Sequence, residues 1–138
     1  MLIPQLSESA NLATANQALC RDLSLLFTRL LTELERAIAR SAGRPIAEEF
    51  EQRLNLYAAK HGWKVLTGLA HLTDLQEHVP EVDARMLANV LASYAQYART
   101  LAGQILGEQL LLTTLVTFVN TLSPQAVELN RQYRIISV

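Results

Sequence analysis

Apolar residues recur at steps of three, four and seven positions along much of the chain, which is the period of amphipathic helices. Over residues 9–42 this stripe consists of Leu12, Leu19, Leu23, Leu26, Leu30, Leu34 and Ile38. The other side of the same segment carries Arg21, Thr28, Thr32, Glu35 and Arg36. Gly43 can adopt the left-handed backbone conformation that ends a helix, and Pro45 is suited to the first turn of the next helix. The pattern therefore predicts a long helix over 9–42 and an antiparallel helix over about 45–61.

Two further helices follow from the same period. A third is predicted over about 63–78, and it ends before Pro80 because the residue preceding a proline avoids helical geometry. From residue 81 a second long stripe consists of Val82, Met86, Val90, Tyr94, Tyr97, Leu101 and Ile105. Gly103 and Gly107 lie just before a polar interruption of this stripe, where a kink is possible. We expect a continuous or gently bent helix to about Leu122.

Residues 110–119, LLLTTLVTFV, contain no charged side chain. They fall short of the roughly 20 residues that a membrane-spanning helix needs. A helix on the outside of a monomeric bundle buries only about half of such a segment, so a second subunit is expected to cover the rest. The predicted dimer interface consists of Leu111, Leu112, Leu115, Val116, Phe118 and Val119.

Together these segments predict an all-α fold, an antiparallel bundle of four to five helices, two of them long, that forms a homodimer. Residues 1–122 are the helical domain, and residues 123–138 are either a tail or the start of a following domain. Ser123 as N-cap before Pro124 predicts a short helix ending near Arg134. Alternating apolar residues on both sides of NRQY predict a pair of strands instead.

The apolar residues of the strand alternative are Val127, Leu129, Ile135, Ile136 and Val138. Their arrangement resembles the opening of a PAS domain, in which an apolar strand, a polar turn and an RI strand follow a linker helix. The resemblance covers only about a dozen residues, and the remainder of a PAS domain does not follow within the sequence. It implies an N-terminal helical module of a multidomain sensory or signalling protein.

The chain has 138 residues, enough for one domain with a real core, and a net charge of −1. Charged residues make up 18%, below the ~25% usual for soluble domains, so much apolar surface must be hidden. The basic residues are scattered, which argues against nucleic-acid binding. The single cysteine, Cys20, excludes an intrachain disulfide and is expected to be a small buried hydrophobe. The N-terminus lacks a signal-peptide pattern, so we expect a cytoplasmic protein without a membrane span.

The candidates for chemistry are the histidines His61, His71 and His78. HGWK at 61–64 is similar in part to the H-x-x-K-G motif of histidine phosphotransfer domains, but Val65 replaces its glycine and Gly62 interrupts the helix. On the third helix, Asp74 lies between the other two histidines. Those two are separated by a rise of about 10.5 Å, too far for one metal ion to bind both. We therefore expect a polar surface and no metal site.

No serine, threonine or cysteine is placed beside a base in a predicted pocket, so no catalytic residue is assigned. The aromatic residues Trp63, Tyr94, Tyr97 and Phe118 are expected to pack in the core rather than to line a ligand pocket. The leading prediction is a non-enzymatic dimerisation or sensory-input module of a cytoplasmic signalling protein, without a cofactor, whose partners are a second copy and other signalling domains. The alternatives are a bundle that binds an apolar small molecule or a haem-like cofactor through one of the histidines, and a phosphotransfer protein that uses His61.

Overall fold

The computed structural model describes the backbone of residues 3–61 and 82–137, with side chains from residue 14 onward. The prediction of an all-α fold is confirmed, because every regular element within these ranges is a helix. The helices are α1 (Ile3–Ala42), α2 (Arg44–His61), α3 (Ala84–Leu106), α4 (Glu108–Asn120) and α5 (Pro124–Tyr133). The predicted helix over 63–78 lies outside the described residues. Among the described helices, none has the length and hydropathy needed to cross a membrane.

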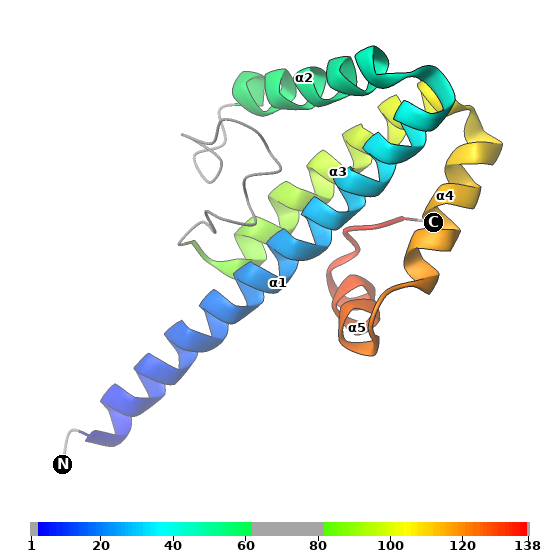
Figure 1. The fold of residues 1–138 in the computed structure, drawn as a ribbon. Coiled ribbons are helices and arrows are strands. Elements are labelled where there is room, and N and C mark those ends of the chain that lie inside the picture. The colour runs from blue at the N-terminus through cyan, green and yellow to red at the C-terminus, as the bar shows by residue number, and fades with distance from the viewer. Residues whose placement is uncertain (1–2, 62–81, 138) are drawn as a thin grey trace.

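The first two helices form the hairpin that the sequence predicts. Gly43 adopts a φ of +96°, a left-handed conformation that glycine reaches without a side-chain clash. The Gly43 amide still donates to the Ala39 carbonyl at 3.1 Å, and the Gly43 carbonyl accepts from the Ala47 amide at 3.2 Å. The chain therefore ends one helix and begins the next within a single residue, and α2 folds back over α1 (Figure 1).

The core lies mainly between α1 and α3, which run side by side (Figure 1). Fully buried side chains in this layer include Leu23, Phe27, Leu31, Leu34, Ile38, Leu87, Leu91 and Tyr94. From α2, Phe50 and Leu54 close the layer on one side. The first turns of α1 project beyond the other helices (Figure 1). Because α1 has neighbours on more than one side, its buried stripe is wider than the sequence suggested, and Thr28 is buried at 5% exposure rather than facing solvent.

Asn16 connects α1 to the start of α3. Its Nδ2 donates to the Val82 carbonyl at 2.8 Å, and its Oδ1 accepts from the Ala84 amide at 2.9 Å. The Cys20 thiol donates to the same Val82 carbonyl at 3.3 Å. Burial raises the pKa of Cys20, and the nearby Asp83 carboxylate raises it further, so this thiol is the buried structural residue that the sequence predicts.

The prediction of a continuous or gently bent helix from 81 to 122 is wrong. The helix ends at Leu106, and Gly107 adopts φ 86° and ψ 152°, a region open almost only to glycine. The chain then turns back as α4 (Figure 1). This reversal brings the apolar side of α4 against its own chain, which a straight rod cannot do. Gly103 permits the close approach, because a Cβ there would lie 3.1 Å from a methyl carbon of Leu111.

The C-terminal tail adopts the helical alternative rather than the pair of strands. Ser123 caps α5 by accepting from the Ala126 amide at 3.2 Å, and Arg134 ends it with a φ of 55°. The Asn130 side chain then pairs with both backbone groups of Ile136, at 2.7 Å and 3.1 Å. Ile135 and Ile136 are buried, at 2% and 6% exposure. The segment on which the PAS resemblance rested is therefore a helix and a buried extended end.

Candidate functional site: the groove between α1 and α5

The apolar segment of α4 is divided between the core and the surface. Leu111, Leu115 and Phe118 are buried within their own chain, at 0%, 1% and 3% exposure. Leu112 and Val116 are exposed at 38% and 45%. The first three side chains are therefore occupied inside one subunit, and only the exposed pair, with half-buried Val119, remains available to a partner from the predicted interface.

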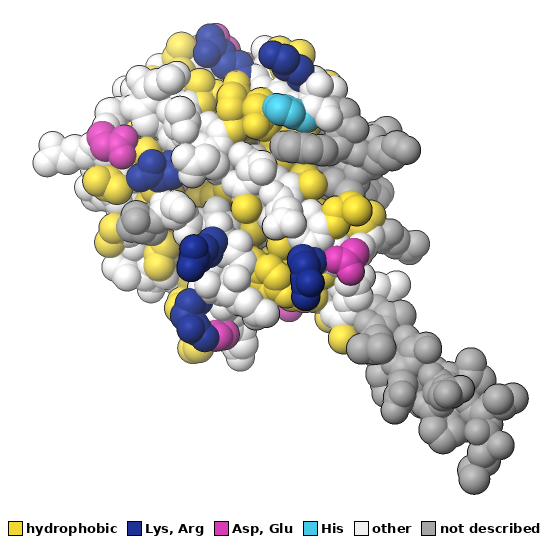
Figure 2. All heavy atoms as spheres, turned by 180° about the vertical axis from the view of Figure 1, so that it is seen from behind, with side chains coloured by type: hydrophobic (Ala, Val, Ile, Leu, Met, Phe, Trp, Pro, Cys, Tyr) yellow, Lys and Arg dark blue, Asp and Glu magenta, His cyan; other side chains and the backbone are white. Residues whose placement is uncertain are grey.

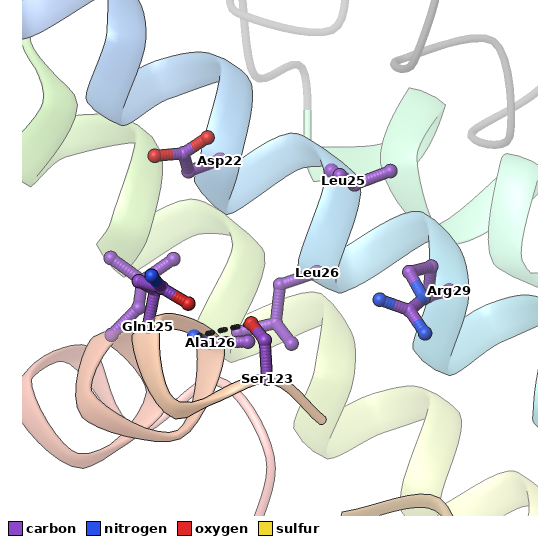
Figure 3. Close-up of a pocket in the computed structure, with 8 residues that line it drawn as sticks. Asp22, Leu25, Leu26, Arg29, Ser123, Gln125 and Ala126 are labelled. Carbon is purple, nitrogen blue, oxygen red and sulfur yellow. Dashed lines mark hydrogen bonds between the residues drawn. The ribbon is translucent and has the colours of Figure 1, made fainter. Parts of the chain in front are cut away.

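A groove of about 340 Å³ runs between α1 and α5 (Figure 3). Its lining residues are Asp22, Leu25, Leu26 and Arg29 from α1 and Ser123, Gln125, Ala126 and Leu129 from α5. The α1 residues share a face because they are separated by three, four and seven positions. The α5 residues reach this face because the chain reverses at Gly107 and again before Ser123.

The charges of the groove lie at its two ends. Figure 3 shows Asp22 and Arg29 well apart, with the leucines of α1 and the start of α5 between them. A separation of seven helical residues corresponds to about 10.5 Å of rise, so the two side chains cannot form an ion pair with each other. Over residues 14–61 and 82–137, the ion pairs connect other residues. Both charges therefore face solvent without a compensating partner in that part of the chain.

Leu26 points toward α5 and is buried at 3%, whereas Leu25 lies on the side of α1 farther from α5 and is exposed at 38% (Figure 3). An apolar centre between charged ends is the usual layout of a protein interface, with a dry middle and a polar rim. The arrangement is suited to binding, and it places no nucleophile beside a base.

Elsewhere in the described part of the chain, the charged side chains do not gather in one place. On the face shown in Figure 2, cationic side chains occupy separate places, several of them beside an acidic one. Two of the ion pairs join Arg53 to Glu49 at 3.0 Å and Arg131 to Glu128 at 2.6 Å. Surface pairs of this kind contribute little stability. Because the described cations are scattered, they form no continuous basic stripe that could bind a phosphate backbone.

His61 lies exposed at the end of α2, and its ring is 4.2 Å from that of Tyr57. Tyr57 in turn stacks on Tyr97 at 4.0 Å and meets Tyr94 edge-on at 5.4 Å. Tyr94 and Phe118 are core residues, as predicted. Within residues 14–61 and 82–137, no group of three or more His, Cys, Asp or Glu side chains could hold a metal ion.

The other two candidate histidines, His71 and His78, and the predicted core residue Trp63 lie outside the described part of the chain. Tyr57, Tyr94 and Tyr97 pack against one another between α2 and α3. An open hollow of about 330 Å³ lies beside these rings and is lined by Tyr57, His61 and Tyr97. The phosphotransfer role of His61 stays a prediction.

Two carboxylates, Glu35 of α1 and Glu51 of α2, lie near each other where the two helices pack. The Glu35 side chain is partly buried, and its Oε1 is shielded from solvent with no hydrogen-bond partner among the described residues. Burial, together with repulsion from Glu51, raises the pKa of Glu35 to about 7. The sequence pattern placed Glu35 on the wet side of the helix, but α2 packs over it.

We expect the Glu35→Gln variant to lose part of the pH dependence of stability. Because the folded pKa is raised, the folded protein holds this proton between the ordinary value of 4.5 and about 7, while the unfolded chain releases it. The unfolding free energy therefore falls as the pH rises through that window. After discounting for partial exposure, the loss by pH 8 amounts to roughly 1–2 kcal/mol, which glutamine avoids.

Urea unfolding at pH 5 and pH 8 checks this expectation. The exposed Glu49→Gln substitution on the same α2 helix serves as the matched control and should leave the wild-type pH dependence in place. Identical pH dependence in wild type and Glu35→Gln contradicts the assignment.

The α1 side of the groove could have been predicted from the sequence. Asp22, Leu25 and Arg29 are spaced at three and seven positions on the solvent side of the first helix, a pattern that can be read from the sequence alone. The α5 side could not be found in this way, because only the reversals of the chain bring Ser123 and Leu129 beside α1. Comparisons with protein-family models, curated proteins and solved structures found no match.

Proposed function

We propose that this chain is a non-enzymatic dimerisation module of a signalling protein, and that the groove between α1 and α5 belongs to its interface. The observation that carries the proposal is the exposed Leu25, flanked by Asp22 and Arg29 without compensating partners among the described residues. An isolated apolar side chain on a surface is ordinary, but one centred between two uncompensated charges of opposite sign matches the core and rim of an interface.

The position of the groove supports a role in transmitting a signal. α5 lines the groove and leads directly into the tail, which is anchored at two points. Asn130 holds Ile136, and the Arg99 guanidinium of α3 donates to the Ser137 carbonyl at 3.1 Å. A partner seated on α1 and α5 would therefore bias the position of the C-terminal end. A ligand that favours one arrangement of the dimer would act on the same end.

A second candidate function is supported by the volume of the groove. About 340 Å³, with Leu25, Leu26, Ala126 and Leu129 in the lining, lies in the range of small-molecule sites. An apolar molecule with one anionic and one cationic group would suit the two charged ends. A ligand of this kind could occupy the groove only in the monomer or at the dimer seam.

The proposed function predicts a dimer in solution. Sedimentation equilibrium of the full chain at micromolar concentrations should give twice the chain mass of 15.4 kDa, and dilution should return the single-chain mass. Raising the salt concentration should weaken the dimer, because exposed charges at an interface rim are screened. A single-chain mass at all concentrations up to the solubility limit contradicts the proposal.

A further inference from the structure

We propose that two copies pair through α1 in an antiparallel manner, about a two-fold axis that passes between residues 25 and 26. In this arrangement Asp22 of each copy faces Arg29 of the other. The inference rests on the proposed dimerisation and adds its surface, its direction and its register.

The first step is the symmetry of the charges. Asp22 and Arg29 lie at equal distances on either side of the midpoint between Leu25 and Leu26. An interface around a two-fold axis brings the same patch of both subunits together, so that residue i meets j and j meets i. One rotation therefore forms both Asp22–Arg29 pairs at once and satisfies both ends of both grooves.

The second step is the apolar centre. The same rotation brings the exposed Leu25 side chains of the two copies together near the axis, between the two ion pairs. Burial of these two leucines contributes hydrophobic free energy to the association, which does not depend on direction. The flanking charges set the register.

The third step is the agreement of two further pairs of α1 positions with this register. Ala18 faces Glu33, and Ala15 faces Arg36, so neither pair brings like charges together. Both alanines are exposed and short, which leaves room for the longer charged side chains opposite them.

The direction of pairing follows from the same charges. In the antiparallel arrangement, the projecting first turns of α1 extend along the second half of the partner's α1 (Figure 1). A parallel arrangement in register instead sets each Asp22 against another Asp22 and each Arg29 against another Arg29, which is repulsive at both ends.

The experiment exchanges the two charges singly and together. In Asp22→Arg both groove ends are cationic, and in Arg29→Asp both are anionic, so each variant faces like charges across the axis. Each should dimerise roughly tenfold or more weakly than wild type. The double variant D22R/R29D restores opposite charges and should recover the dimer. Both positions are exposed, so the helical circular dichroism of all three variants should match wild type.

The most discriminating measurement uses a mixture of the two single variants. Asp22→Arg and Arg29→Asp are complementary to each other at both pairs, so an equimolar mixture should form a heterodimer at concentrations where each alone is a single chain. Lys60→Asp, an exposed residue at the far end of α2, makes the same change in net charge as Arg29→Asp and should leave the dimer intact.

Three results separate the possibilities. Recovery in the mixture and in the double variant supports the antiparallel register. Wild-type dimers in both single variants, combined with dissociation by Leu112→Glu with Val116→Glu, overturn the register and place the seam on α4, while the proposed dimerisation stands. A wild-type protein that never dimerises overturns both.

Discussion

Replacing Leu111 with alanine is expected to lower the free energy of unfolding by about 2–5 kcal/mol, the usual cost of truncating a fully buried leucine. Leu111 has 0% exposure and packs near Gly103, at the point where α4 folds back on α3. Its removal leaves a cavity that the tightly connected α3–α4 corner cannot fill, so the loss should lie in the upper part of that range.

The adjacent leucine provides the matched control. Leu112 lies on the same helix with the same propensity, but it is exposed at 38%, so Leu112→Ala should change the free energy of unfolding by no more than about 0.5 kcal/mol in a monomer. Urea unfolding of both variants, at a concentration where the wild type is a single chain, measures the difference. Equal losses in the two variants contradict the division of α4 into a buried and an exposed side.

Replacing Gly107 with alanine is the second large effect that we expect. The φ of 86° and ψ of 152° at this residue are strained for any residue with a Cβ, at about 1–3 kcal/mol. No described atom lies within 4 Å of the position that a Cβ would occupy, so the loss comes from the backbone and not from crowding. A smaller gain from the reduced freedom of the unfolded chain opposes it.

Alanine at this position also makes the alternative of a continuous α3–α4 helix more favourable, because it removes a glycine from the interior of that rod. Such a rod exposes Leu111, Leu115 and Phe118 to solvent. We therefore expect Gly107→Ala to show a lower unfolding midpoint, together with a larger radius of gyration in small-angle scattering or a greater tendency to associate.

The control for this substitution is Gln109→Ala, two residues later on the exposed side of α4. It raises helix propensity slightly without any backbone strain, and it should leave the midpoint and the dimensions of the chain unchanged. A Gly107→Ala protein as stable and as small as wild type contradicts the strained corner.

The positions of the helices could be predicted well where short-range signals define them. The leucine stripe of α1, the Gly43–Pro45 junction and the Ser123–Pro124 start of α5 act within one or two turns of the chain, so they are readable without the fold. Of the two alternatives for the C-terminal end, the pair of strands does not form, because alternating apolar residues also fit the last turns of a helix followed by a buried tail.

The corner at Gly107 illustrates a choice that local signals leave open. A glycine costs only about 1 kcal/mol in the interior of a helix, so a rod and a corner are close in local energy. Burial of Leu111, Leu115 and Phe118, at about 1.5–3 kcal/mol each, stabilises the bent arrangement over the continuous helix. These three residues, predicted to lie in a dimer interface, are therefore part of the core of one chain. Of the predicted interface, Leu112, Val116 and Val119 remain at the surface.

The sequence by itself determined that this is an all-α protein, where its helices begin and end at Gly43 and Ser123, and that α1 carries Asp22, Leu25 and Arg29 on one face. Only the tertiary structure decided which apolar side chains of α4 are enclosed, that Glu35 is covered by α2, and that α5 forms the second side of the groove. The reason is the range of the forces involved. Helix periodicity and capping depend on residues within a few positions of each other, whereas burial and a shared groove depend on segments that meet only after the chain has reversed.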